Sequence, residues 1–158
     1  MATTRDEAEY VSGRGRIKAI SVSKERGTQK VNVPKAELRT DFGIIGDAHA
    51  GNWHRQVSML GAESIDKMIE KGAKVSPGSF AENITTEGID LLALEVGTKL
   101  KIGESARVEI TQFGKTCHDR CEIFQQVGDC IMPREGVFAK VTRPGRLAVG
   151  DIIEVLDE

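Results

Sequence analysis

The sequence predicts a mainly β fold, a closed or nearly closed β-barrel with one or two short helices. At least seven short segments alternate apolar and polar residues or are rich in β-branched residues, a pattern typical of strands. Glycine separates most of these segments. Only one segment has its apolar residues at clear helical spacing. At 158 residues the chain is about one domain long and can bury a core.

The first elements are expected to form a hairpin followed by a loop. Residues 16–23 and 29–33 alternate as strands, with a turn at Gly27 between them, and Pro34 ends the hairpin. A glycine-rich loop is expected to run from residue 42 through Trp53.

The clearest helix is expected over residues 62–71. Ile65, Met68 and Ile69 recur at helical spacing and are expected to face the core. Gly72 is the stop signal at its end.

The remaining strands complete the predicted barrel. They are expected over residues 55–60, 82–86, 98–102, 107–111, 137–142 and 150–156. Residues 1–14 are expected to form a flexible N-terminal tail, and residues 15–158 a single domain.

Composition excludes several classes of partner. The net charge is −2, from 22 basic and 24 acidic residues spread evenly, so no nucleic-acid footprint is visible. No apolar run approaches the roughly 20 residues that span a bilayer. The chain opens without the apolar stretch of a secretion signal, which predicts a cytoplasmic protein.

Three cysteines lie within one short segment just after a predicted strand end. Cys117 and Cys121 are four residues apart, so a short helix that starts at Thr116 or Asp119 would place both thiols on one face. Positive charge from Arg120 favours the thiolate, the form that attacks electrophiles and binds soft metals. The alternative is that these cysteines, with Cys130, are buried and fill space.

A second cluster of polar residues lies in the predicted glycine-rich loop. Gly46 lets the backbone approach a ligand, and Asp47, His49 and Arg55 can project from the loop. Backbone N–H groups of such a loop can also bind anions. The alternative is a capped turn in which His49 is hydrogen-bonded for structural reasons.

A third cluster runs from Pro77 to Gly88 and includes the predicted strand at residues 82–86. Glu82 and Asn83 could clamp a heterocycle by hydrogen bonds. They could equally satisfy buried backbone groups of an irregular loop.

In this order, the clusters resemble those of the MOSC domain, named for the C-terminal domain of molybdenum cofactor sulfurase. The resemblance covers about residues 15–155. The matching motifs are Gly-Ile-Ile-Gly-Asp-Ala-His at residues 43–49, Gly-Ser-Phe-Ala-Glu-Asn-Ile at 78–84, Cys-His-Asp-Arg-Cys at 117–121 and Arg-Leu-Ala-Val-Gly-Asp at 146–151. It implies a β-barrel that binds molybdenum cofactor, with molybdenum coordinated by a cysteine of the segment.

The resemblance leaves two candidates for the catalytic and metal-binding cysteine. Arg120-Cys121 followed by apolar residues matches the amidoxime-reducing relatives best, whereas Cys117 matches better when counted from the preceding strand. Cys121 is preferred. Arg120 is expected among the cofactor-binding residues, and Arg55 or Arg143 is expected to balance the charge of the pterin phosphate.

The implied function is cofactor carriage or sulfur transfer, or reduction of N-hydroxylated compounds. A separate cysteine desulfurase would supply pyridoxal phosphate chemistry, and a molybdoenzyme or an electron-transfer reductase is the other possible partner. Because a barrel brings loop ends together, Asp47, His49, Glu82 and Asn83 are expected to converge on the cysteine segment.

Two readings from other classes stay open. A structural zinc site could use Cys117, Cys121 and either His49 or His54, which are donors that zinc accepts. A non-catalytic barrel that binds a partner protein would bury all three cysteines.

Overall fold

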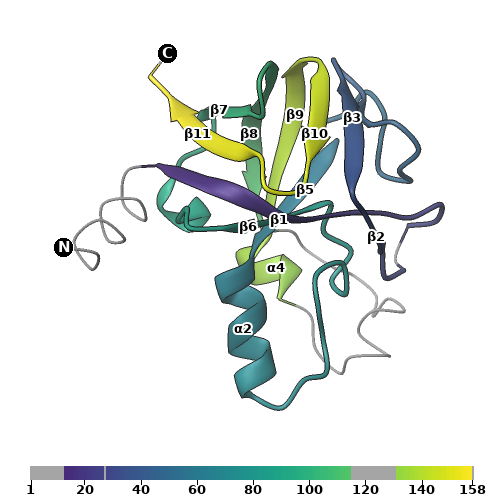
Figure 1. The fold of residues 1–158 in the computed structure, drawn as a ribbon, viewed down its shortest axis with the longest axis vertical. Helices are drawn as coiled ribbons and strands as arrows, with labels where there is room; N and C mark the ends of the chain where they lie inside the picture. Colours follow the sequence, from purple (N-terminus) through teal and green to yellow (C-terminus); the bar gives the residue numbers. More distant parts are fainter. Residues whose placement is uncertain (1–12, 27, 115–130, 158) are drawn as a thin grey trace.

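The computed structural model of the chain describes residues 13–26, 28–114 and 131–157. Seven strands form a closed barrel, because the first and the last of the seven pair with each other (Figure 1). In barrel order the strands are β11 (Ile152–Leu156), β7 (Lys99–Ile102), β8 (Ala106–Phe113), β9 (Val137–Arg143), β5 (Val57–Gly61), β6 (Ile84–Glu87) and β1 (Arg14–Val22). The predicted mainly β barrel is therefore confirmed.

Further elements extend and cover the barrel. Strand β2 (Val31–Val33) continues the sheet from β1, and a three-stranded sheet is formed by β10 (Gly145–Ala148), β3 (Lys35–Arg39) and β4 (Gly43–Ile44). The helices are α2 (Ala62–Glu70), α4 (Met132–Glu135) and the short 3-10 helix η1 (Leu91–Ala93). None of the helices among the described residues has the length and hydrophobicity of a transmembrane span.

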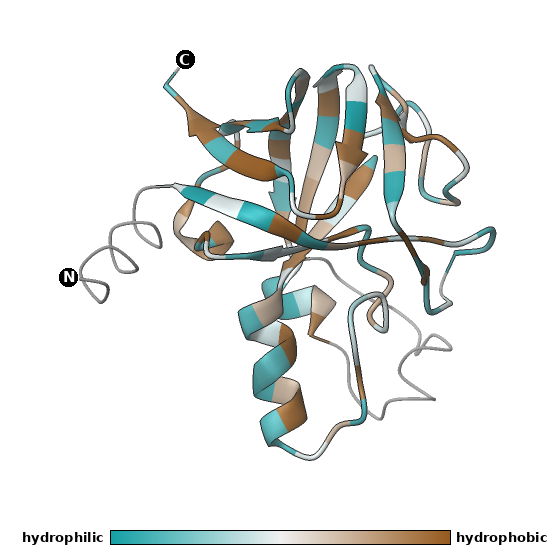
Figure 2. Cartoon of the chain, viewed as in Figure 1, coloured by the Kyte–Doolittle hydropathy of each residue, from teal (hydrophilic) through white to brown (hydrophobic). Residues whose placement is uncertain are grey.

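The barrel closes around an apolar core. Figure 2 shows apolar and polar residues alternating along several strands, as expected when one face is buried. Val137, Ala139 and Val141 of β9 point into the core. Phe138, which alternates with them, belongs to a second apolar cluster with α2 and α4, on the outer side of the barrel wall.

Most of the predicted elements are present, with three differences. Strands β3, β4 and β10 were not predicted from the sequence, and β4 lies in the predicted glycine-rich loop. Ile69 was expected to face the core but is 47% exposed, because α2 packs through Ile65 and Met68 instead. Most of the predicted tail, residues 1–12, lies outside the described residues, and β1 begins at Arg14.

Candidate functional site

A buried polar cluster surrounds Lys30, which directly precedes β2. Its side chain is 0% exposed, and its Nζ donates hydrogen bonds to Oδ1 of Asp47 at 2.8 Å and to Oγ of Ser23 at 2.9 Å. Nδ1 of His49 lies 3.1 Å from the same nitrogen. Lysine is almost never fully buried unless it is paired, and Asp47 is its ionic partner here. We call Ser23, Lys30, Asp47 and His49 the Lys30 cluster.

The carboxylate of Asp47 is held on both oxygens. The backbone N–H of Ser23 donates to Oδ1 at 3.1 Å, and that of His49 donates to Oδ2 at 3.0 Å. Burial by itself raises the pKa of Asp47, but the hydrogen bond and charge of Lys30 and these two N–H groups outweigh it and lower the pKa overall. Asp47 is therefore ionised at neutral pH.

Two arginines lie over the ring of Trp53. Cζ of Arg26 is 4.8 Å and Cζ of Arg55 is 4.7 Å from the ring centroid, and Arg55 also lies 5.7 Å from the ring centroid of Phe138. These distances fit cation–π contacts. We call Arg26, Trp53, Arg55 and Phe138 the Trp53 stack. Nε1 of Trp53 donates to the carbonyl oxygen of His49 at 2.8 Å, so the stack touches the Lys30 cluster.

Within the described ranges, the two guanidinium groups of the stack have no acidic partner. Among the described residues, no carboxylate forms an ion pair with Arg26 or Arg55. Nε of Arg26 donates to the carbonyl oxygen of Ala48 at 3.3 Å. Nε of Arg55 is buried and has no hydrogen-bond partner among the described atoms. Unneutralised cations at a loop make a positive potential that attracts anions.

The Trp53 stack lies beside the place where the cysteine segment leaves the barrel. The hydroxyl of Thr111 donates to the carbonyl oxygen of His54 and, at 3.2 Å, to that of Phe138. The N–H of Gly114 donates to the carbonyl oxygen of Gly136 at 2.7 Å, so described residues that flank the cysteine segment on its two sides meet here.

The cysteine segment itself is not described. Cys117, Arg120 and Cys121 lie outside the described residues, so their roles and the convergence on them stay predictions. Within the part of the chain that the structure describes, no group of three or more His, Cys, Asp or Glu side chains could hold a metal ion.

Glu82 holds the loop that precedes β6. It is 0% exposed, and its carboxylate accepts from the N–H of Gly78 at 2.8 Å, the N–H of Phe80 at 3.3 Å and the hydroxyl of Thr85 at 2.8 Å. Burial raises the pKa of Glu82, and these hydrogen bonds oppose the rise only in part. The contacts agree with the expectation that Glu82 satisfies buried backbone groups.

Asn83 joins strands by hydrogen bonds to their backbones. Oδ1 of Asn83 accepts from the N–H of Ser58 in β5 at 3.0 Å, and its Nδ2 donates to the carbonyl oxygen of Ser21 in β1 at 3.1 Å. Ser23, two residues beyond Ser21, donates to Asp47. The end of β1 therefore connects Asn83 to the Lys30 cluster, and a direct contact of Asn83 with a cofactor stays a prediction.

The remaining predicted residues lie differently. Gly46 is exposed, with φ of +92°, and a Cβ there would meet nothing within 4 Å. In the register of β8 and β9, Arg143 lies opposite Arg107. The cysteine segment leaves the barrel near the opposite end of this strand pair, where Phe113 lies opposite Val137. Six residues of strand separate these positions on β9, or about 20 Å. The structure does not bring Arg143 to the end of β9 where the segment leaves.

Five residues of the Lys30 cluster and the Trp53 stack were not identified as site residues from the sequence: Ser23, Arg26, Lys30, Trp53 and Phe138. Lys30 was assigned to an alternating strand, where a lysine is expected to face solvent. Arg26 and Trp53 were not singled out either. The available signal was the single Trp53 in the same loop as His49 and Arg55.

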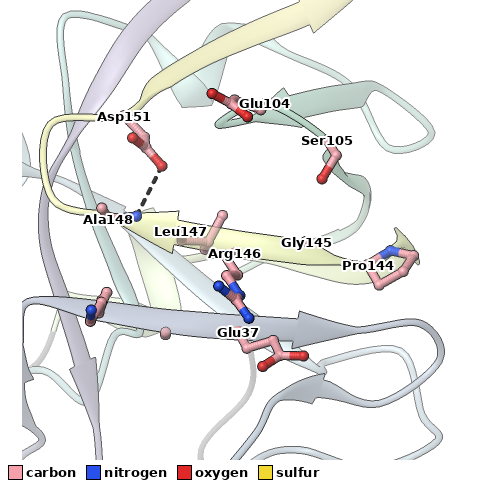
Figure 3. Close-up of a pocket in the computed structure, with 11 residues that line it drawn as sticks. Glu37, Glu104, Ser105, Pro144, Gly145, Arg146, Leu147, Ala148 and Asp151 are labelled. Carbon is pink, nitrogen blue, oxygen red and sulfur yellow. Dashed lines mark hydrogen bonds between the residues drawn. The ribbon is translucent and has the colours of Figure 1, made fainter.

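Two hollows lie away from these clusters. One, of about 860 Å³, lies along β10 and is lined by residues of mixed charge, including Glu37, Glu104 and Arg146. In Figure 3, Asp151 accepts a hydrogen bond from the N–H of Ala148 at its rim. The other, of about 360 Å³, lies beside α2. In this second hollow, Glu135 accepts hydrogen bonds from Ser64 and Lys67 and so connects α4 to α2. Neither hollow has a feature that points to a ligand.

The comparisons with known proteins identify the family. A family model described as the MOSC domain matches residues 46–154, whereas no curated protein matches the chain. The YuaD protein from Bacillus subtilis has a similar solved structure, with a TM-score of 0.75 and 19% identity, covering 90% of this chain and 95% of that chain. YiiM from Geobacillus stearothermophilus gives a TM-score of 0.68 and 17% identity, covering 90% of this chain and 75% of that chain.

YiiM from Escherichia coli gives a TM-score of 0.60 and 19% identity, covering 90% of this chain and 70% of that chain. At such identities the likeness shows the fold alone. The family model, in contrast, matches more than half of the sequence and includes the loop of Asp47 and His49. The chain therefore belongs to the MOSC domain family, which is associated with molybdenum cofactor binding.

Proposed function

We propose that this protein binds molybdenum cofactor between the Trp53 stack and the cysteine segment. The observation that carries the proposal is the pair of guanidinium groups of Arg26 and Arg55, which lie over Trp53 without an ion-pair partner among the described residues. Guanidinium groups match phosphate geometry in two parallel hydrogen bonds. The phosphate of a pterin cofactor is an anion that would satisfy them.

The donors at this site fit such a group. The buried Nε of Arg55 lacks a partner among the described atoms, so a ligand acceptor would remove an unfavourable buried donor. The charge of Lys30, in contrast, is already balanced by Asp47. Arg26 and Arg55 are therefore proposed to hold the phosphate, and the Lys30 cluster to shape the loop behind them.

Other residues have proposed roles in the same site. Cys121, or Cys117 in its place, would ligate molybdenum as a thiolate, and Arg120 would add positive charge. Exposed Gly46 would let the backbone approach the pterin. Glu82 and Asn83 would act by fixing the neighbouring backbone, because their polar atoms already bind protein groups.

Bound molybdenum cofactor would supply either a redox-active metal or a metal that accepts sulfur. Reduction of an N-hydroxylated compound consumes two electrons and two protons, so it needs an electron-transfer reductase as partner. Sulfur transfer needs a cysteine desulfurase as donor and a molybdoenzyme as acceptor. We propose one of these two roles, and the source of electrons or sulfur distinguishes them.

Metal analysis of the purified protein tests the proposal. Wild type and the variants Cys117→Ser, Cys121→Ser and Cys130→Ser are expressed in cells that make the cofactor, and molybdenum and pterin fluorescence are measured. We expect wild type and the matched control Cys130→Ser to hold both, and Cys121→Ser to lose both.

Two results would contradict parts of the proposal. Equal molybdenum in wild type, Cys117→Ser and Cys121→Ser would exclude both cysteines as ligands. Zinc in place of molybdenum, lost in the same two variants, would support the structural zinc site instead.

A further inference from the structure

The chemistry of lysine sets the direction of the hydrogen bond between Lys30 and His49. An ammonium group has three N–H donors and no lone pair. Among the described residues, Nζ of Lys30 lies 2.8 Å from Oδ1 of Asp47, 2.9 Å from Oγ of Ser23 and 3.1 Å from Nδ1 of His49. The hydroxyl of Ser23 donates its own proton to the carbonyl oxygen of Glu25 at 2.8 Å, so its oxygen accepts from Lys30.

Lys30 must keep its proton in this setting. Both its side chain and that of Asp47 are 0% exposed, and a neutral lysine would leave the Asp47 carboxylate without a balancing charge. The Lys30 ammonium can only donate to Nδ1 of His49. Nδ1 must therefore accept this hydrogen bond, which places the proton of the neutral ring on Nε2.

This arrangement reverses the usual pairing of carboxylate and histidine. In that pairing Nδ1–H donates to the carboxylate and Nε2 is left as the base or the metal ligand. Here Oδ2 of Asp47 is 3.8 Å from Nδ1 of His49, too far for a hydrogen bond, and it accepts instead from the backbone N–H of His49 at 3.0 Å. Trp53 holds the His49 carbonyl oxygen at 2.8 Å, so the residue is fixed at three points.

We propose that Lys30 is a positioning residue that fixes His49 with its proton on Nε2, so that the ring donates a hydrogen bond to an anionic oxygen of the ligand. The side chain of His49 is 21% exposed, so a ligand beside the Trp53 stack can reach its ring. The identity of the ligand rests on the function proposed above, whereas the position of the proton does not. In this state Nε2 of His49 is a donor and neither a base nor a metal ligand.

NMR spectra that correlate ring protons with ring nitrogens test the tautomer without any cofactor. The chain contains three histidines, so His49→Gln and His54→Gln suffice to assign the His49 signals. At neutral pH we expect wild-type His49 to carry a proton on Nε2 and none on Nδ1. A proton on Nδ1 of His49 would overturn the inference.

Two variants test the part of Lys30. Lys30→Met removes the donor, and Lys30→Met with Asp47→Asn removes it without leaving a buried charge, which protects folding. We expect the form with a proton on Nδ1 to become detectable in the double variant and to stay absent in the control Lys35→Met, at an exposed lysine. An unchanged His49 tautomer in the folded double variant would overturn the role of Lys30.

Retained molybdenum tests the ligand contact separately. We expect about tenfold less molybdenum per protein in the double variant, as for the loss of one hydrogen bond to a charged group. Equal retention in wild type and the double variant would overturn the contact. If wild type retains no molybdenum while His49 shows the expected tautomer, the proposed function fails and the assignment of the proton stands.

Discussion

The backbone N–H of Lys30 donates to the carbonyl oxygen of Gly78 at 2.9 Å. Gly78 in turn donates its N–H to Glu82 at 2.8 Å, so this bond joins the loop held by Glu82 to the Lys30 cluster. The contact requires close approach, because a Cβ on Gly78 would lie 2.7 Å from the carbonyl oxygen of Lys30. The buried Lys30–Asp47 pair thus depends on a loop more than forty residues further along the chain.

Gly78→Ala and Gly46→Ala form a matched pair that separates this close approach from backbone strain. Both glycines have positive φ, +95° and +92°, so both substitutions carry the strain of roughly 1–2 kcal/mol. Only the Cβ at Gly78 also collides with backbone. We expect Gly78→Ala to lower the free energy of unfolding by about 1–3 kcal/mol more than Gly46→Ala in urea titrations. Equal losses would show that the Gly78 loop moves aside easily.

Lys30→Met should be strongly destabilising because it leaves a buried carboxylate without its cation. For fully buried pairs such a loss costs about 3–5 kcal/mol. Lys30→Met with Asp47→Asn removes both charges, so we expect it to be more stable than Lys30→Met alone. Urea unfolding of wild type, both single variants and the double variant gives the coupling energy. Additive losses would contradict a direct Lys30–Asp47 interaction.

Glu82 should make the fold less stable as the pH rises. Its folded pKa lies above the unfolded value of 4.5, because burial disfavours the charged form. Between these two values the folded state holds a proton that the unfolded state has released, so the free energy of unfolding falls with rising pH. Asp47 and Glu135 have lowered pKa values, so their contributions change below 3.8 and 4.5, outside this window.

Glu82→Gln should therefore flatten the pH dependence above pH 4.5. The absolute stability of this variant can change as well, because an amide cannot accept all three hydrogen bonds, but the slope depends on titration alone. Urea unfolding at intervals above pH 4.5 measures it. The same slope in wild type and Glu82→Gln would assign the effect to another group.

Local patterns in the sequence account for the barrel but not for the second sheet. Alternation, β-branched residues and glycine punctuation predicted the barrel strands, because each is long enough to show a local pattern. Strand β3 (Lys35–Arg39) has a single fully buried residue, Leu38, among charged neighbours, and its partner β4 has only two residues. Such short pairings are decided by tertiary contacts.

The centre of the candidate site was hidden for a similar reason. Lys30 is buried because of Asp47 and His49, which follow it by 17 and 19 residues. No local pattern marks such a contact, so the sequence placed Lys30 in an alternating strand and in no candidate site. Asp47 and His49 were found because small residues flank polar ones in their loop, a local signal for a site.

Arg55 and Arg143 were equal candidates from the sequence, and the structure separates them. Cζ of Arg55 lies 4.7 Å from the ring centroid in the Trp53 stack, whereas Arg143 is an exposed residue at the far end of β9. We expect Arg55→Met to reduce retained molybdenum by at least about tenfold, since a charged hydrogen bond to phosphate is lost. Arg143→Met should retain as much as wild type.

The single tryptophan gives a second measurement on the same two variants. Because Trp53 is the chain's one tryptophan, its fluorescence reports on this loop alone. When inorganic phosphate is added to protein without cofactor, a phosphate that draws Arg55 away from the ring should change the emission in wild type and in Arg143→Met. The response should be smaller in Arg55→Met, where Arg26 is the guanidinium that still lies over the ring. An equal response in Arg55→Met and Arg143→Met would show that Arg55 does not bind the anion.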